Sequence, residues 1–206
     1  ELRAQLLSLA RHSRKYIILA DHFLKLPIFK NRLMIVKYED LVTSPSNYLK
    51  KICKFLQIKF HRDMINPNKY YDFVTNKTWV PFSSFNTKFP KLNNKPINKW
   101  KKYLSDIEVK SIELLCEKEM CTVGYDMKFK NKENHFEEVM KYVEKDYDKK
   151  VSWRSDLQNF EKDKSMEFIR YKILKKEISA NKSVLKKCFL IEDYSLSNLI
   201  LLLQID

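Results

Sequence analysis

The sequence predicts an α/β protein that is rich in helices and has few strands. An apolar strand over residues 33–38 is followed closely by a helix that begins near Pro45, which is half of a βαβ unit. The 206 residues contain one glycine, whereas average usage of about 7% would give roughly 14. Because dinucleotide-binding turns and phosphate loops need several glycines, both kinds of site are excluded. A β-sandwich or propeller is disfavoured, since tight hairpins depend on glycine and asparagine.

The first predicted element is an amphipathic helix over residues 2–26. It ends at Pro27, which cannot continue a helix. Its apolar residues recur at helical spacing and are interleaved with basic ones. The apolar set is Leu2, Leu6, Leu9, Ile17, Ala20, Phe23 and Leu24, and the basic set is Arg3, Arg11, Arg14 and Lys15.

The strand and the helix after it come next. Residues 33–36 are four consecutive apolar residues between polar neighbours, which is typical of a strand buried on both faces. Ser44 is the expected N-cap of the following helix, and Pro45 suits its first position because no N–H is needed there. The apolar residues that follow fall on one helical face. They are Tyr48, Leu49, Ile52, Phe55 and Leu56.

Residues 57–98 are expected to be mostly irregular, because prolines and asparagines are frequent there. A helix over residues 105–122 is predicted next. Ser105 and Glu108 form an S-x-x-E capping box, and Gly124 stands where a left-handed residue would end the helix. The sequence then becomes rich in charged residues. We therefore expect residues 1–129 to form one domain and residues 130–206 a charged linker with a helical extension.

Charge and cysteine content suggest further limits on function. The formal net charge is +14, so a basic helical module that binds nucleic acid is one hypothesis. The lysines are spread along the sequence, however, and no nucleic-acid-binding signature is found. The four cysteines form no C-x-x-C pair and do not cluster with histidines, so no metal site is expected. No apolar run approaches the 18 or so residues of a membrane span.

Four short motifs in order resemble the sulfotransferase family. Residues 33–42, read as L-M-I-V-K-Y-E-D-L-V, are similar to its V-R-Y-E-D-L-V segment, and Phe55-Leu56-Gln57-Ile58 to its F-L-G-I helix end. Residues 79–85 resemble its N-S-S-F element. Residues 95–104 resemble its tryptophan-led helix start, and the segment that ends Gly124-Tyr125 resembles its G-Y close. The resemblance covers roughly residues 30–126.

The resemblance implies part of a P-loop-like α/β fold, with a helical tail added. It also implies transfer of a sulfuryl group from 3′-phosphoadenosine 5′-phosphosulfate to a hydroxyl or amine of a carbohydrate, peptide or small molecule. No metal is implied. The family's 5′-phosphosulfate loop, its 3′-phosphate Arg and Ser, and its catalytic base cannot be placed in this sequence. No catalytic residue is therefore assigned.

The donor-binding residues that the resemblance implies are Ser83, Ser84 and Lys95. A serine of the serine-containing element and the lysine of K-P-[VI]-N contact the nucleotide in relatives. Phe82 replaces the family's asparagine, which departs from the pattern. Tyr38, Glu39 and Asp40 are interpreted as structural, with the acidic pair accepting backbone N–H bonds. Trp100 is interpreted as a packing anchor.

Three hypotheses thus stand beside one another: a sulfotransferase, a basic nucleic-acid-binding module, and a catalytically inactive sulfotransferase-like remnant. The sulfotransferase interpretation is preferred, because a positive field also suits a polyanionic donor, and nucleic acid is not the expected partner. Both ends of the chain are expected to be cut. The expected compartment is the cytoplasm, or the Golgi lumen if an N-terminal anchor is missing.

Overall fold

The computed structural model describes residues 2–66, 69–77, 97–129, 135–149 and 159–189. It divides the chain into two compact units, which are treated separately below. Unit 1 combines residues 1–27 with residues 104–206, and unit 2 spans residues 28–103.

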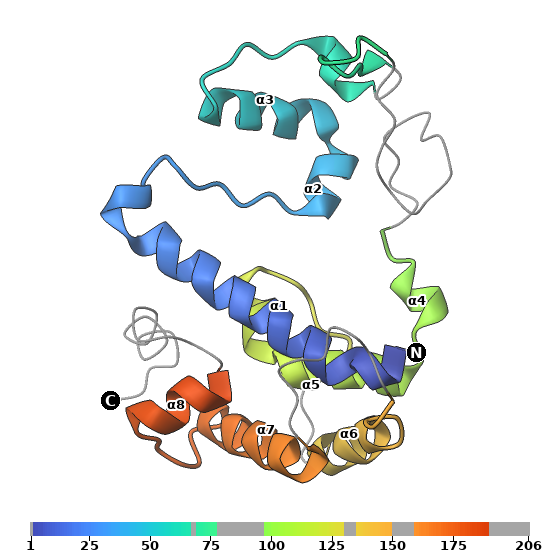
Figure 1. Cartoon of the computed structure of the whole chain (residues 1–206), viewed down its shortest axis with the longest axis vertical. Helices are drawn as coiled ribbons and strands as arrows, with labels where there is room; N and C mark the ends of the chain where they lie inside the picture. The colour runs from blue at the N-terminus through green and yellow to red at the C-terminus, as the bar shows by residue number, and fades with distance from the viewer. Residues whose placement is uncertain (1, 67–68, 78–96, 130–134, 150–158, 190–206) are drawn as a thin grey trace. The chain divides into compact units, whose positions relative to one another are not determined.

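Five helices build the described part of unit 1: α1 (Leu2–Lys25), α5 (Asp106–Thr122), α6 (His135–Glu144), α7 (Phe160–Leu174) and α8 (Lys182–Phe189). Helix α1 contacts α5, α6 and α8, while α6 contacts α5 and α7, and α7 contacts α8 (Figure 1). The predicted first helix is confirmed, because α1 ends at Lys25, just before Pro27. The first helix therefore shares one helical body with helices that begin more than 80 residues later in the sequence.

Two apolar clusters form the core of unit 1. The larger cluster joins α1, α5 and α6 through residues such as Leu7, Leu115 and Met140, all of them fully or almost fully buried. The smaller cluster joins α1, α7 and α8 through Ile18, Ile173 and Leu185. Each cluster needs side chains from three helices, so neither can form from one sequence segment alone.

Helix α5 is bounded as the sequence predicts. At its start, the Ser105 backbone N–H and hydroxyl both donate to Glu108 Oε2, at 2.8 and 2.7 Å. At its end, Gly124 has a φ of 71°. The Gly124 N–H donates to the Cys121 carbonyl and the Tyr125 N–H to the Met120 carbonyl, which is a Schellman motif. The capping box and the glycine thus fix the helix locally.

Unit 2 has shorter elements. They are α2 (Tyr38–Thr43), α3 (Pro45–Phe55), η2 (Arg62–Ile65) and α4 (Trp100–Tyr103), and η1 (Pro27–Phe29) leads into the unit. Helix α3 contacts α2 and η2. Pro45 opens α3 as predicted, but the Ser44 side chain makes no capping hydrogen bond. The described residues between 57 and 98 are mostly irregular, as expected.

The predicted strand over residues 33–38 is wrong. Residues 33–37 follow no regular structure, and Tyr38 already belongs to α2. No strand occurs anywhere in the described ranges, so the expected α/β character is absent from them. A strand needs a neighbour to accept and donate its backbone hydrogen bonds, and none is present among these residues. Ile35 is accordingly 49% exposed rather than buried on both faces.

The two compact units do not follow the predicted boundary at residue 129. Helices α6, α7 and α8 of the predicted extension pack in the same unit as α1 and α5. Helices α7 and α8 both lie within residues 130–206. Among the helices of the described residues, none combines the length and the apolar character needed to cross a bilayer.

Candidate functional site

The most concentrated polar chemistry in the described residues is a buried ion-pair network in unit 1. Arg11 and Arg14 stand one turn apart on α1 and are both buried, Arg14 with 2% exposure. Glu167 of α7 lies between them. Its Oε1 accepts from Arg11 Nε at 3.0 Å and from Arg14 Nη2 at 2.7 Å, and its Oε2 accepts from Arg14 Nη1 at 2.8 Å. One carboxylate therefore binds two guanidinium groups.

A second carboxylate extends the network along α7. Asp163 Oδ1 accepts from Arg11 Nη1 at 2.8 Å. Its other oxygen, Oδ2, accepts from the hydroxyl of Tyr147, which follows α6. The Tyr147 ring also packs edge-to-face against Phe160 at the start of α7. The network thus connects α1, α7 and the segment after α6.

The network also satisfies a backbone carbonyl at a kink in α5. Cys116 leaves helical geometry, with φ −123° and ψ 16°. The Leu115 carbonyl accepts from Arg14 Nη1 at 2.9 Å and from Arg170 Nη1 at 3.1 Å. Helices kink where a side chain inserts into the hydrogen-bond ladder. Two arginines from two other helices therefore hold α5 in its bent form.

Arg170 of α7 completes the set. Its Nη2 donates to both oxygens of Glu119, at 2.7 and 2.9 Å, and its guanidinium lies 5.1 Å from the ring centre of Phe189. Arg170 and Glu119 are both 2% exposed. Its Nε is a buried nitrogen without a hydrogen-bond partner. The network contains three arginines and three carboxylates, so its formal charge is zero.

The electrostatics of Glu167 follow from this arrangement. Burial alone would raise the pKa of its carboxyl, but the charge and hydrogen bonds of Arg14 and the charge of Arg11 lower it to about 2. Burial would likewise lower the pKa of Arg14, and Glu167 reverses this so that the pKa is raised. Both groups remain ionised across the neutral range. Neither is suited to exchange protons near neutral pH.

The network is therefore a set of ion pairs with a structural role. Its guanidinium groups are directed to carboxylates, a carbonyl and an aromatic ring of the same unit. The sequence interpretation treated Arg11 and Arg14 only as the charged residues of an amphipathic helix, and missed their burial. One signal was present: Asp163, Glu167 and Arg170 repeat at helical spacing and form a charged stripe on α7.

The Tyr-Glu-Asp motif lies in unit 2, at the first turn of α2. Glu39 and Asp40 both fall in this turn, where carboxylates suit the positive end of the helix. The Asp40 carboxylate accepts a hydrogen bond from the Tyr48 hydroxyl on α3, which raises the pKa of Tyr48. The Asp40 carbonyl accepts from the Ser44 N–H at 3.0 Å. The Asp40 carboxylate thus joins α2 to α3 through a side-chain hydroxyl, whereas the sequence predicted that it would accept backbone N–H bonds.

The predicted donor-binding residues Ser83, Ser84 and Lys95 lie outside the described residues. Their proposed contacts to a nucleotide remain predictions. Trp100, the expected packing anchor, is 39% exposed, and the Lys101 ammonium lies 5.6 Å from its ring centre.

Cysteine and charge are distributed unevenly. All four thiols are free, and Cys53, Cys116 and Cys188 are buried. No cluster suited to hold a metal ion occurs among the residues that the structure describes. Unit 2 contains sixteen Lys and Arg against four Asp and Glu, a net charge of +12, whereas unit 1 contains 24 against 22, a net charge of +2. The net positive charge is therefore concentrated in unit 2 because acidic residues are scarce there, while the basic residues themselves are spread over both units, as the sequence suggested.

Comparison with known proteins locates the relationship in the first part of the chain. Residues 2–62 match the model of the family described as the sulfotransferase family. Residues 2–62 are therefore similar to the sulfotransferase family. The match takes in α1, η1, α2 and α3, so it includes the Tyr-Glu-Asp motif and the Phe55–Ile58 helix end. No curated protein and no solved structure matches the chain.

The sulfotransferase match and the motif resemblance overlap over residues 30–62. The match adds α1, which the motifs did not include. It ends before the serine element, Lys95 and Gly124. The family relationship thus crosses both compact units, because α1 belongs to unit 1 while α2 and α3 belong to unit 2.

Proposed function

We propose that this chain contributes to a sulfotransferase that uses 3′-phosphoadenosine 5′-phosphosulfate as donor and a hydroxyl or amine as acceptor. The observation that carries the proposal is the sulfotransferase match over residues 2–62. Motifs that resemble the same family continue in the same order as far as Gly124 and Tyr125.

The proposed reaction moves a sulfuryl group between two oxygens, or from oxygen to nitrogen. The acceptor atom bonds to sulfur, the bond from sulfur to the 5′-phosphate oxygen breaks, and a base takes the acceptor's proton. Negative charge then gathers on the leaving 3′,5′-adenosine bisphosphate, so positive groups near that product lower the barrier. The net charge of +12 in unit 2 supports this role, since Lys95 lies in that unit.

Lys95 and Ser84 are proposed to contact the donor nucleotide, and the test measures binding of 3′,5′-adenosine bisphosphate to the chain and its variants. A charge-assisted contact contributes about 1.5–3 kcal/mol. Lys95→Ala should therefore raise the dissociation constant roughly 10- to 100-fold, at about 1.4 kcal/mol per decade. Ser84→Ala removes a neutral contact of about 1 kcal/mol and should raise it about fivefold.

Matched controls come from α4. Lys101→Ala and Lys102→Ala remove exposed lysines that carry the same charge. The expected order of effects is Lys95, then Ser84, then the two controls. Equal losses from all four variants would contradict the contacts assigned to Lys95 and Ser84, because the charge would then act only as a diffuse field.

A separate expectation concerns catalytic turnover by the chain alone. The 206-residue chain should bind 3′,5′-adenosine bisphosphate weakly and transfer no sulfuryl group by itself, because no 5′-phosphosulfate loop can be assigned in its sequence. The assay follows transfer of labelled sulfate to hydroxyl and amine acceptors. Efficient turnover would show that the active site has been assigned to the wrong residues.

A further inference from the structure

A tight turn in unit 2 presents two apolar side chains to solvent. The carboxylate of Asp72 accepts hydrogen bonds from the N–H groups of Val74 and Thr75, at 2.8 and 3.2 Å. The Asp72 N–H donates to the Lys77 carbonyl, and the Asn76 N–H donates to the Asp72 carbonyl, both at 2.8 Å. Asn76 has a φ of 51°, which closes the turn. This hydrogen-bonded segment, residues 72–77, is called the Asp72 turn below.

The tip of the Asp72 turn is apolar. Phe73 is 91% exposed and Val74 is 89% exposed, the highest values among the large apolar residues described. Exposed apolar residues are common one at a time. Here two adjacent ones stand at the apex of a turn whose backbone is held by its own carboxylate, and neither belongs to a core cluster of the described residues.

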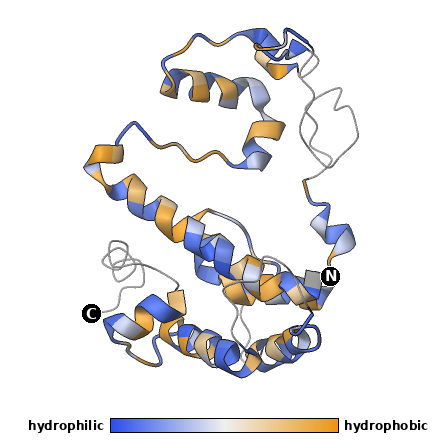
Figure 2. Cartoon of the chain, viewed as in Figure 1, coloured by the Kyte–Doolittle hydropathy of each residue, from blue (hydrophilic) through white to orange (hydrophobic). Residues whose placement is uncertain are grey.

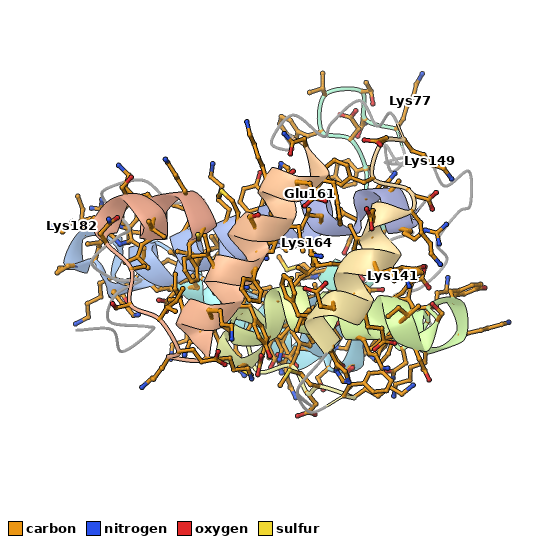
Figure 3. The ribbon with its side chains drawn as sticks, turned by 90° about the horizontal axis from the view of Figure 1, so that it is seen from below. Lys77, Lys141, Lys149, Glu161, Lys164 and Lys182 are labelled. Atoms are coloured by element: carbon orange, nitrogen blue, oxygen red, sulfur yellow. The ribbon has the colours of Figure 1, made fainter. Side chains whose placement is uncertain are left out.

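The base of the turn is anchored and basic. The Tyr70 hydroxyl donates to the Met64 carbonyl of η2, and the Met64 sulfur lies 3.6 Å from Cys53 Sγ of α3. Lys69, whose ammonium pairs with Asp63 at 2.6 Å, and Lys77 flank the turn, and Lys77 extends away from the ribbon (Figure 3). Tyr71 precedes the turn and is exposed. An apolar tip with tyrosine and lysine beside it is the pattern of protein segments at a lipid–water interface.

We propose that the Asp72 turn is a membrane-docking element that inserts Phe73 and Val74 into the surface of an anionic bilayer. The net charge of +12 in unit 2 attracts the unit to acidic head groups, and the tip adds apolar insertion. Lys77 sits at the depth of the head groups when the tip is inserted. The proposal is independent of the sulfotransferase reaction.

The combination of groups favours lipid over nucleic acid. A nucleic acid would use the same positive charge, but it gains little from an exposed valine, whereas a bilayer gains from burying both tip residues. The two partners therefore predict different results for the tip. Charge substitutions weaken binding to either partner, while tip substitutions weaken binding to lipid alone.

The test is co-sedimentation of the full chain with vesicles. Phosphatidylcholine vesicles should bind little, and vesicles of phosphatidylcholine mixed with phosphatidylserine should bind strongly. The double variant Phe73→Ser, Val74→Ser should lose at least about tenfold in affinity for the mixed vesicles. Lys77→Gln should lose about fivefold, the effect of one basic residue at an anionic surface.

A matched control tests whether replacing any exposed aromatic residue would weaken vesicle binding. Tyr16→Ser removes an exposed aromatic residue from α1 in unit 1 and should leave vesicle binding unchanged. Far-ultraviolet circular dichroism should show the same helix content in all variants, because neither Phe73 nor Val74 supports a core. Equal vesicle binding by the tip variant and the unchanged chain would overturn the proposal. Binding to duplex DNA or RNA without binding to vesicles would also overturn it.

Insertion can be observed directly with Phe73→Trp. Added anionic vesicles should shift the emission of the new tryptophan to shorter wavelength, and brominated lipids should quench it. The unchanged chain, with Trp79, Trp100 and Trp153, provides the background signal. No vesicle-dependent change beyond this background would show that the tip stays in water, and would contradict the proposal.

Discussion

The two units differ in what they bury. Among the described residues, unit 1 buries eighteen apolar side chains and every buried polar or charged one, including the three arginines of the network. Unit 2 buries only Val42 and Cys53 of its described apolar residues and exposes ten large ones. Hydrophobic residues nevertheless occur along the helices of both units (Figure 2). Stability in the described part of the chain is therefore concentrated in unit 1.

The difference shows how charge can be buried at one site and left in solvent at another. In unit 1 each buried guanidinium meets carboxylates from another helix, which offsets the cost of removing both from water. Unit 2 has sixteen basic residues and only four acidic ones, so most of its lysines have no carboxylate to pair with inside the unit. The comparison predicts that substitutions in unit 1 alter folding, whereas most of those in unit 2 do not.

The largest effect is expected from Glu167→Gln. This substitution removes the negative charge between Arg11 and Arg14 and leaves two buried cations short of a partner. Breaking a buried pair in this way costs about 3–5 kcal/mol of the free energy of unfolding, which urea denaturation measures. The control is Glu137→Gln on α6, whose carboxylate pairs with Lys164 at 2.8 Å near the surface and contributes no more than about 1 kcal/mol. Similar losses from both variants would show that burial of the Glu167 ion pairs does not increase their contribution to stability.

A pair of apolar truncations compares the units directly. Met140→Ala in unit 1 removes a side chain with no exposed surface and should cost about 2–5 kcal/mol. Leu56→Ala in unit 2 removes an exposed side chain and should change the free energy of unfolding by no more than about 0.5 kcal/mol. Thermal and urea unfolding of both variants provide the measurement. A large loss from Leu56→Ala would reveal apolar packing in unit 2 that the described residues do not show.

The pH dependence of stability should also originate in unit 1. The pKa of Glu167 is lowered from an ordinary 4.5 to about 2, so the ionised form favours the folded chain. Its contribution is fully present above pH 4.5 and is lost as the pH falls from about 4.5 to about 2. Melting temperatures across this range should fall steeply for the unchanged chain. Glu167→Gln should fall less, because it has no carboxylate left to protonate at that position; an unchanged slope would contradict the role of Glu167.

Helix ends supply the next comparison. Gly124 ends α5 in unit 1 with a φ of 71°. Gly124→Val should cost about 1–2 kcal/mol, because a β-branched side chain is disfavoured at positive φ. Gly124→Asn should cost less, since asparagine tolerates this conformation. Urea unfolding followed by circular dichroism distinguishes the two variants, and equal losses would show that the backbone conformation is not the cause.

A small effect of opposite sign is expected at the equivalent position of α3 in unit 2. Gln57 has a φ of 57°, and the Ile58 N–H donates to the Cys53 carbonyl, so α3 ends in the same Schellman motif without a glycine. Gln57→Gly should raise the free energy of unfolding of unit 2 by about 1 kcal/mol, by removing the left-handed penalty. Slower hydrogen exchange of the α3 amides in the variant would show this gain in stability. Faster exchange in the glycine variant would contradict this explanation.

Left-handed backbone positions in both units are occupied mostly by residues other than glycine among the described residues. Five residues other than glycine adopt positive φ among those described, namely Asn31, Gln57, Asn76, Asn98 and Lys176. Three are asparagines, which tolerate this region better than most residues. The scarcity of glycine therefore did not prevent left-handed helix ends and turns, which form at other residue types.

The sequence by itself determined where the main helices begin and end. Pro27 and Pro45 set one boundary each, and Ser105, Glu108 and Gly124 fixed α5, because these signals act over one turn of backbone. It also identified the Tyr-Glu-Asp motif and the sulfotransferase relationship, which the match over residues 2–62 supports. Ser83, Ser84 and Lys95 remain predictions from that relationship.

Tertiary structure alone decided which groups are buried and which pair. Arg11 and Arg14 became core residues because α7, more than 140 positions later, brings Asp163 and Glu167 to the same place. Residues 33–37 did not become a strand, because strand formation depends on a partner rather than on apolar residues in a row. Both outcomes depend on contacts between distant segments, which a local pattern does not encode.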